Sequence, residues 1–173
     1  SSVRWVLDVF GNCVAHVEVS GSARELHFES RIRLEHTPQN EPHLSIAESA
    51  LTYPFGYSPD ETDDLAATLR PHYPDPEVER FARRFVKPGK PTPTGGLLMT
   101  LCYAIHEGFA YSRRHEHGTQ PPRLTLALRR GTCRDFALLM MEAARTLGFA
   151  ARFVTGYVYV PDRDGSDTRG GGS

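Results

Sequence analysis

The chain has 173 residues, of which 39% are hydrophobic and 24% are charged, and its formal net charge is −1. The longest apolar run, 136–141, has six residues, far below the roughly 20 that a membrane helix needs. The balanced charge gives no basic surface for nucleic acid or anionic lipid. We therefore expect one globular domain or two small ones, with neither a nucleic-acid nor a membrane partner.

The cysteines and the start of the chain indicate the compartment. Cys13, Cys102 and Cys133 are too few for a disulfide scaffold and lack the spacing of a zinc site. The opening residues, Ser1-Ser2-Val3, do not have the basic and apolar regions of a signal peptide. We expect a reducing, cytoplasmic setting. Because no Met opens the chain, we also expect that a segment was lost from its front.

The first part of the chain has the pattern of β structure. The stretch from Asp8 to Asn12 is typical of a turn between two strands that pair as a hairpin. Apolar and polar residues alternate over most of 13–20 and again over 25–34, which predicts antiparallel strands with one solvent-exposed face. Because three strands do not close a sandwich, we expect a partial N-terminal β-sandwich over residues 1–65.

Connecting structure and then two helices are predicted for the middle of the chain. Seven of its 13 prolines lie between residues 36 and 76, which favours irregular structure there. Asp75 as the cap and Pro76 at the first helical position then begin a helix that runs to about residue 85. A second helix is predicted from about Thr94 to Phe109.

A third helix gives the strongest signal. Thr132 and Asp135 have the spacing of a capping box, and Gly148 is placed to end the helix. Few polar residues lie between them, so we expect a central helix that is buried on most sides. A strand rich in Val and Tyr is expected over 151–160.

Cys133 is the residue that carries chemistry. Capping by Thr132 places Cys133 at the first helical position, where the helix dipole and the free N–H groups favour a thiolate. The same N–H groups can stabilise an oxyanion that forms when the thiolate attacks a carbonyl. This is the arrangement of Cys-His hydrolases and acyltransferases.

Two stretches carry a resemblance to a known family. They are Gly-Thr-Cys-Arg-Asp-Phe-Ala-Leu-Leu-Met at 131–140 and Ala-Arg-Thr-Leu-Gly-Phe-Ala-Ala-Arg-Phe-Val-Thr-Gly-Tyr at 144–157. With them the chain resembles the bacterial transglutaminase-like cysteine protease superfamily. The resemblance implies an α+β fold with a papain-like core over 66–173 and Cys133 as nucleophile. It also implies an N-terminal β-sandwich, and the turn at 8–12 is similar to a recurring part of that domain.

The chain departs from the family after Cys133. The family completes its triad with a histidine in a His-Ala-Trp strand and an aspartate in an Asp-Pro-Thr segment. No histidine occurs in 134–173, and all eight histidines precede Cys133. We therefore expect a chain cut ahead of its general base and inactive by itself, in which the catalytic histidine and aspartate are not present.

Other candidate residues have simpler interpretations. We expect Cys13 and Cys102 to be packed among apolar residues, and Asp135 to be a cap and an ion-pair partner of Arg134. His106 is expected to be structural, although it is the first histidine to test as a base for Cys133. Surface or packing roles are expected for the rest: His115 and His117 on the surface rather than in a metal site, Tyr111 in packing, and Asp162, Asp164 and Asp167 in a solvated loop.

The leading hypothesis is a cysteine-dependent amide or peptide hydrolase or acyltransferase that works through an acyl-enzyme. It implies a peptide, protein or amide substrate and no metal or organic cofactor. The alternative is a non-catalytic relative that binds a peptide or partner, and a third hypothesis is a structural module in which Cys133 only opens a helix. The substrate, the choice among protease, amidase and transglutaminase, and the oligomeric state stay open.

Overall fold

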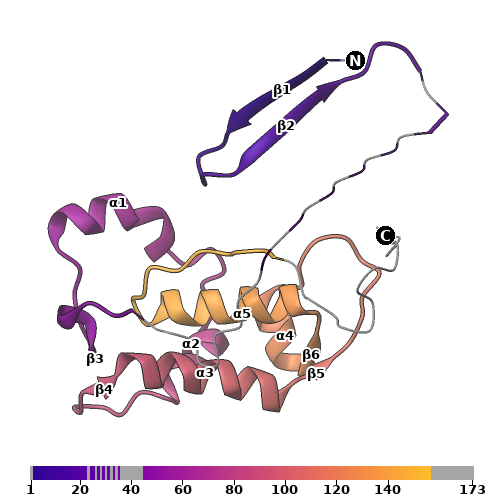
Figure 1. Cartoon of the computed structure of the whole chain (residues 1–173). Helices are drawn as coiled ribbons and strands as arrows, with labels where there is room; N and C mark the ends of the chain where they lie inside the picture. Colours follow the sequence, from indigo (N-terminus) through magenta and orange to yellow (C-terminus); the bar gives the residue numbers. More distant parts are fainter. Residues whose placement is uncertain are drawn as a thin grey trace. The chain divides into compact units, whose positions relative to one another are not determined.

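The computed structural model describes residues 2–22, residues 24, 25, 27, 29, 31, 33 and 35, and the continuous stretch 45–156. Five α-helices, one short 3₁₀ helix and six strands make a mixed α+β fold within these residues (Figure 1). The chain divides into two units, Ser1–Pro42 and His43–Ser173. The division therefore falls before residue 65, where the sequence pattern had placed it. None of the helices in the described part is long and apolar enough to cross a membrane.

The first unit contains the predicted hairpin. Strands β1 (Ser2–Leu7) and β2 (Cys13–Glu18) are antiparallel, and Val3 pairs with Val17 across them. In the turn, Asp8 Oδ1 accepts hydrogen bonds of 2.8 Å from the backbone N–H groups of Phe10 and Asn12. Hydrogen bonds from the Asn12 side chain and backbone lower the pKa of Asp8. The turn signal at 8–12 is thus confirmed.

A complete sandwich is not seen in the described residues of this unit. Cys13 is exposed, so the prediction that it packs in apolar surroundings was wrong. Residues 26, 28, 30, 32 and 34 of the second alternating run lie outside the described residues, and the described ones between them are not in a strand.

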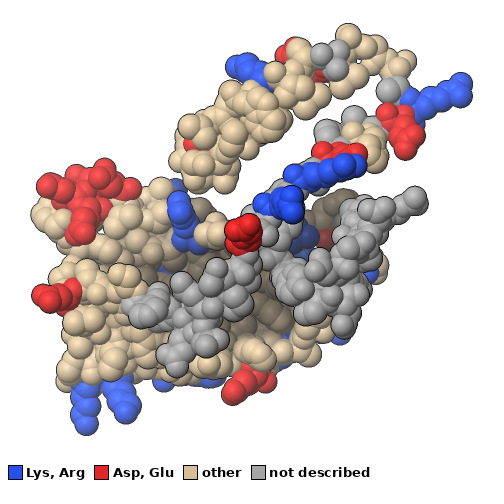
Figure 2. Space-filling view, viewed as in Figure 1, with Lys and Arg blue, Asp and Glu red and all other residues tan. Residues whose placement is uncertain are grey.

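The proline-rich middle contains a helix that the sequence pattern did not predict. Helix α1 (Pro59–Leu69) begins at the N-cap Ser58, whose hydroxyl accepts a 3.3 Å hydrogen bond from Glu61 N. Glu61 Oε2 in return accepts a 2.8 Å hydrogen bond from Ser58 N. Pro59 does not interrupt this helix because the N–H that proline lacks has no partner in a first turn. Acidic side chains gather over α1, as Figure 2 shows.

Short strands link this region to the helices that follow. The 3₁₀ helix η1 (Glu48–Ala50) precedes β3 (Thr52–Tyr53), and β3 pairs antiparallel with β4 (Thr92–Pro93). Helices α2 (Pro76–Arg83) and α3 (Thr94–Gly108) match the two predicted helices, and Asp75 caps α2 through a 2.8 Å hydrogen bond from Glu77 N.

Helix α5 (Cys133–Thr146) is the centre of the second unit. Helices α2, α3 and α4 (Pro122–Leu128) all contact it, and Leu139 and Ala143 on it have no exposed surface. These confirm the buried central helix. Gly148 follows with a φ of +90°, a conformation that glycine adopts at little energetic cost. The predicted strand over 151–160 is not formed at 151–156, and its remaining residues lie outside the described part.

A buried ion pair fastens the C-terminal half of α5 to the chain around it. Glu142 has no exposed surface and Arg145 is 5% exposed. Arg145 Nη1 lies 3.3 Å from Glu142 Oε1, which is close enough for a charge-assisted hydrogen bond. Glu142 Oε2 accepts a 2.8 Å hydrogen bond from Tyr73 N, and Arg145 Nη2 donates one of 2.7 Å to Ala151 O. Both charges are therefore compensated, as burial requires.

Replacing Arg145 should reveal how much this pair contributes. We expect Arg145→Met to lower the free energy of unfolding by about 3–5 kcal/mol, because Glu142 keeps its charge without a cationic partner. The matched control is Arg83→Met, which removes an exposed pair with Glu79 at 2.7 Å and should change stability by about 1 kcal/mol or less. Urea titration measures both, and equal losses in the two variants would contradict the prediction.

Candidate active site

Cys133 is the first residue of α5, and its side chain is exposed and free. The residue before it, Thr132, is the N-cap, with the extended backbone that an N-cap adopts (φ −89°, ψ 171°). In Figure 1, α4, β5 and β6 lie at this end of α5. The thiol is thus presented at the surface from the start of a helix whose remaining turns are largely buried.

A capping box fixes the start of α5. Thr132 Oγ1 accepts a 3.4 Å hydrogen bond from Asp135 N and donates one of 2.9 Å to Asp135 Oδ2. Asp135 Oδ2 also accepts a 2.8 Å hydrogen bond from Thr132 N. The spacing of Thr132 and Asp135 predicted this motif, and the structure contains it in full.

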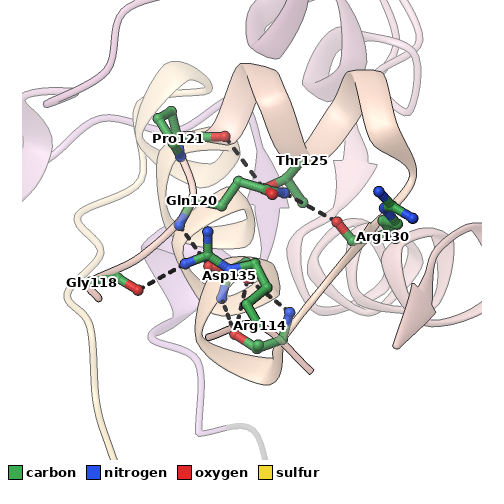
Figure 3. A network of polar contacts seen from close by, with 8 residues as sticks. Arg114, Gly118, Gln120, Pro121, Thr125, Arg130 and Asp135 are labelled. Carbon is green, nitrogen blue, oxygen red and sulfur yellow. Dashed lines mark hydrogen bonds and ion pairs between the residues drawn. The ribbon is translucent and has the colours of Figure 1, made fainter. Parts of the chain in front are cut away.

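The Asp135 carboxylate reaches well beyond its own helix. It has no exposed surface, and its Oδ1 accepts a 2.6 Å hydrogen bond from Gln120 N (Figure 3). Arg114 Nε lies 3.1 Å from Oδ2 in an ion pair, although without hydrogen-bond geometry. The expected partner, Arg134, is exposed, so that part of the prediction was wrong: the pairing cation is Arg114, which the sequence separates widely from Asp135.

These contacts set the charge state of the carboxyl group. Burial raises the pKa of Asp135. The hydrogen bonds from Thr132 and Gln120 and the charge of Arg114 lower that pKa by more than burial raises it. The net effect is a pKa below the ordinary value. Asp135 is therefore an anion that accepts hydrogen bonds and is unsuited to donate a proton to a substrate.

A second layer of polar contacts joins Asp135 to α4. Gln120 is 4% exposed, and its Nε2 donates to Thr125 Oγ1 at 3.0 Å and to Arg130 O at 3.1 Å. Arg114 Nη2 donates to Gly118 O at 2.9 Å, which shapes the loop between them (Figure 3). The loop, α4 and the start of α5 are thus held by one connected set of polar groups.

Two short parallel strands bring the chain to Cys133. Strand β6 (Arg130–Gly131) pairs with β5 (Ala110–Tyr111), and Gly131 O accepts a 2.8 Å hydrogen bond from Ser112 N. Gly131 is buried directly against the Asp135 side chain. A Cβ atom there would lie 2.9 Å from Asp135 Cβ and 3.1 Å from its Oδ2. Glycine at 131 therefore allows the close approach on which the capping box depends.

A small polar pocket lies beside Cys133. Its volume is about 90 Å³, and its wall includes the residues on both sides of Cys133 together with His117 and Glu116 from the loop; the full lining is Arg114, Glu116, His117, Gly118, Thr132 and Arg134. Within the described residues, no hydrogen bond joins a histidine to Cys133. The site thus holds an exposed thiol next to a pocket of mixed charge.

The family model described as Transglutaminase-like superfamily matches residues 79–171, which include α3, α4, α5 and Cys133. The chain belongs to the transglutaminase-like superfamily. No curated protein and no solved structure matches the chain significantly.

The other candidate residues lie apart from the thiol or differ from expectation. Cys102 on α3 is exposed, so the prediction that it packs in the core was wrong. Tyr111 is 69% exposed and does not have the predicted packing role. His106, His115 and His117 are exposed, and no group of three metal-ligating side chains occurs among the described residues. Asp162, Asp164 and Asp167 lie outside the described residues.

The sequence reasoning missed Arg114, Gln120 and Gly131. Arg114 belongs to a run of charged residues that indicated a solvated loop, yet its side chain is 19% exposed. Gly131 offered the one usable signal, since a glycine directly before a helix cap is typical of a close backbone approach.

Substitution of Gly131 tests whether its close contact with Asp135 stabilises the start of α5. We expect Gly131→Ala to lower the free energy of unfolding by about 1–3 kcal/mol, because the added methyl overlaps Asp135. Gly56→Ala is the matched control: its Cβ has no neighbour within 4 Å, so stability should change by about 0.5 kcal/mol or less. If urea titration finds both variants equally stable, the Asp135 side chain moves aside without a loss of stability, and the close approach of Gly131 is not required.

Proposed function

We propose that the protein is a cysteine-dependent amide or peptide hydrolase or acyltransferase in which Cys133 is the nucleophile. One observation carries the proposal: an exposed, free thiol occupies the first position of a capped, buried helix inside the segment that matches the superfamily. A thiol at this position faces the positive end of the helix dipole and N–H groups that can stabilise negative charge formed beside it.

Backbone donors for an oxyanion stand beside the thiol. Asp135 N and Thr132 N are used in the capping box, and Phe136 N donates to Thr132 O at 3.1 Å. In the described part of the chain, the N–H groups of Cys133 and Arg134 make no hydrogen bond. They are therefore free to donate to the oxygen of a tetrahedral intermediate at Cys133.

The reaction that follows is acyl transfer. The Cys133 thiolate adds to the carbonyl carbon, a carbon–sulfur bond forms, and the carbonyl oxygen takes the negative charge. Expulsion of the amine leaves a thioester, which water hydrolyses or another amine aminolyses. The amine needs a proton in order to leave, and that proton requires a positioned acid. Of the histidines in the described part of the chain, His117 is the one that lines the pocket beside Thr132 and Arg134, so we place it before His106 as a residue to test.

We further propose that the hairpin of the first unit belongs to a β-sandwich. One side of β1 consists of Val3, Trp5 and Leu7, which are 56%, 66% and 77% exposed. Alternation of this kind is typical of a strand that covers a second layer.

Selective alkylation tests the thiolate at the helix start. We expect iodoacetamide to modify Cys133 faster than Cys102 between about pH 5 and 7, because only Cys133 lies at a helix N-terminus. Cys102 is a matched comparison, since it is also exposed and helical. Mass mapping after short exposures gives both rates in one sample, and Cys102→Ser and Cys133→Ser confirm the assignment. Faster labelling of Cys102 would count against an activated Cys133.

A pair of acyl donors tests the nucleophile separately from the acid. We expect p-nitrophenyl acetate to acetylate Cys133, because p-nitrophenolate leaves without a proton. The matched p-nitroanilide should not be cleaved at a measurable rate, because an anilide is intrinsically less reactive than an activated ester and its amine must be protonated as it leaves, and no histidine follows Cys133 in residues 134–173. Cys133→Ser should abolish acetylation. Measurable anilide cleavage that is lost in Cys133→Ser would mean that an earlier histidine supplies the proton, and loss of that cleavage in His117→Ala or His106→Ala would identify it.

The second candidate is a non-catalytic relative that binds a peptide or partner. The observation that favours it is that, among the described residues, no histidine is hydrogen-bonded to Cys133. Such a protein would show no preferential acetylation of Cys133 by the activated ester and no advantage over Cys102 in alkylation.

A further inference from the structure

A second, larger pocket lies between α2 and α4. Its volume is about 330 Å³. Four arginines line it, with one glutamate and three apolar residues: Arg80, Arg84, Arg123, Arg129, Glu77, Phe81, Leu126 and Ala127. None of these residues lines the pocket beside Cys133. A chain with a net charge of −1 thus concentrates positive charge at a site apart from the thiol.

The four arginines are not equally compensated. Arg80 Nη1 lies 2.6 Å from Glu77 Oε2, and Arg123 Nε lies 3.9 Å from Asp75 Oδ2. Among the described residues, no carboxylate lies within 4.0 Å of Arg84 or Arg129. These two guanidinium groups therefore keep their charge and their donors available for a ligand.

Aromatic rings hold both guanidinium groups in place. The Arg84 Cζ atom lies 5.4 Å from the centre of the Phe81 ring and 5.3 Å from that of Phe85. Arg129 Cζ lies 5.0 Å from the centre of the Phe109 ring. Stacking on a ring orients the planar group and leaves its edge free to donate, which reduces the entropy lost when an anion binds.

The backbone at Arg129 is a second, independent indication of use. Arg129 ends α4 with a φ of +51°, and it is the one residue other than glycine with positive φ in the described part of the chain. Glycine is favoured in this conformation, and a residue with a Cβ atom is strained there. An arginine at a position that favours glycine indicates that its side chain is needed.

We propose that this pocket binds a small organic anion with a doubly charged head and an apolar body. The head is a phosphate monoester or a pair of adjacent carboxylates, since arginine pairs with both through two parallel hydrogen bonds. The apolar body fits the pocket because Phe81, Leu126 and Ala127 form part of its wall. Inorganic phosphate lacks that second feature and serves as a comparison.

Calorimetric titration of the whole 173-residue chain tests the proposal. The probes are phenyl phosphate and phthalate, which share an apolar ring and differ in the head group, with inorganic phosphate and phenol as the separated parts. We expect phenyl phosphate or phthalate to bind more tightly than inorganic phosphate and phenol do. Added NaCl should weaken the binding of that dianion. The tighter of the two identifies the head group.

Two substitutions locate the binding. Arg84→Gln and Arg129→Gly should each weaken the tighter probe about tenfold or more, the usual effect of losing a charge-assisted hydrogen bond. Arg129→Gly leaves the positive φ favourable, so urea titration should find the fold as stable as before. Arg83→Gln is the matched control: it removes the same charge from the same helix at a residue outside the pocket lining, and should bind the probe as the unmodified chain does.

Binding that is lost in both variants and kept in Arg83→Gln would support the site. Three results would overturn it: no saturable binding of either dianion at millimolar concentration, affinity for inorganic phosphate equal to that for phenyl phosphate, or equal losses in Arg83→Gln and Arg84→Gln.

Discussion

The buried carboxylate of Asp135 is the constraint on which the start of α5, and with it the position of Cys133, depends. A carboxylate without exposed surface must be surrounded by donors, because water cannot reach it. Thr132 and Gln120 supply hydrogen bonds and Arg114 supplies a positive charge, from three different segments. Each contact thereby fixes its own segment against α5: the cap, the loop before α4, and the start of the charged loop. The position of Cys133 follows from this arrangement, because it lies between the two residues of the capping box and its own N–H has no hydrogen-bond partner in the described part.

Buried charges also connect the second half of α5 to neighbouring segments of the chain. Glu142 and Arg145 are buried with the apolar side chains of the helix, and each binds chain segments outside it, at Tyr73 and Ala151. A helix buried on most sides ordinarily carries few charges. Helix α5 nevertheless buries three charged side chains, those of Asp135, Glu142 and Arg145. Each of them forms a hydrogen bond with a backbone group of a neighbouring segment. The charges therefore specify which segments may pack on α5, whereas the apolar residues supply most of the driving force for burial.

How much could be predicted from the sequence depended on the range of the interaction. The Thr132–Asp135 box, the Asp75 cap and the glycine at 148 were predicted because each involves residues within a few positions of one another. The ion pair of Asp135 with Arg114 was not predicted, because no feature of the nearby sequence favours the distant Arg114 over the adjacent Arg134 as the partner. Helix α1 was missed because Pro59 and the prolines on either side of the helix were taken as a sign of irregular structure. The exposure of Cys102 was missed because α3 is apolar over much of its circumference, so periodicity did not single out its buried face.

Helix α4 connects the two sites that the structure presents. Thr125 accepts a hydrogen bond from Gln120, which in turn binds Asp135. Arg123, Leu126 and Ala127 line the arginine pocket, and their spacing of three and four positions puts them on one face of the helix, away from Thr125. A helix of seven residues has little stability of its own and relies on contacts on both faces. A ligand shifts an equilibrium between two states by no more than the difference in its affinity for them. An anion that contacts α4 would therefore influence the start of α5 only if it bound more tightly to one arrangement of the Gln120–Asp135 contact than to another. One physical connection between the thiol and the arginines is this short helix with the two hydrogen bonds that lead from it to Asp135, and α2, which also lines the arginine pocket, packs directly on α5 as well.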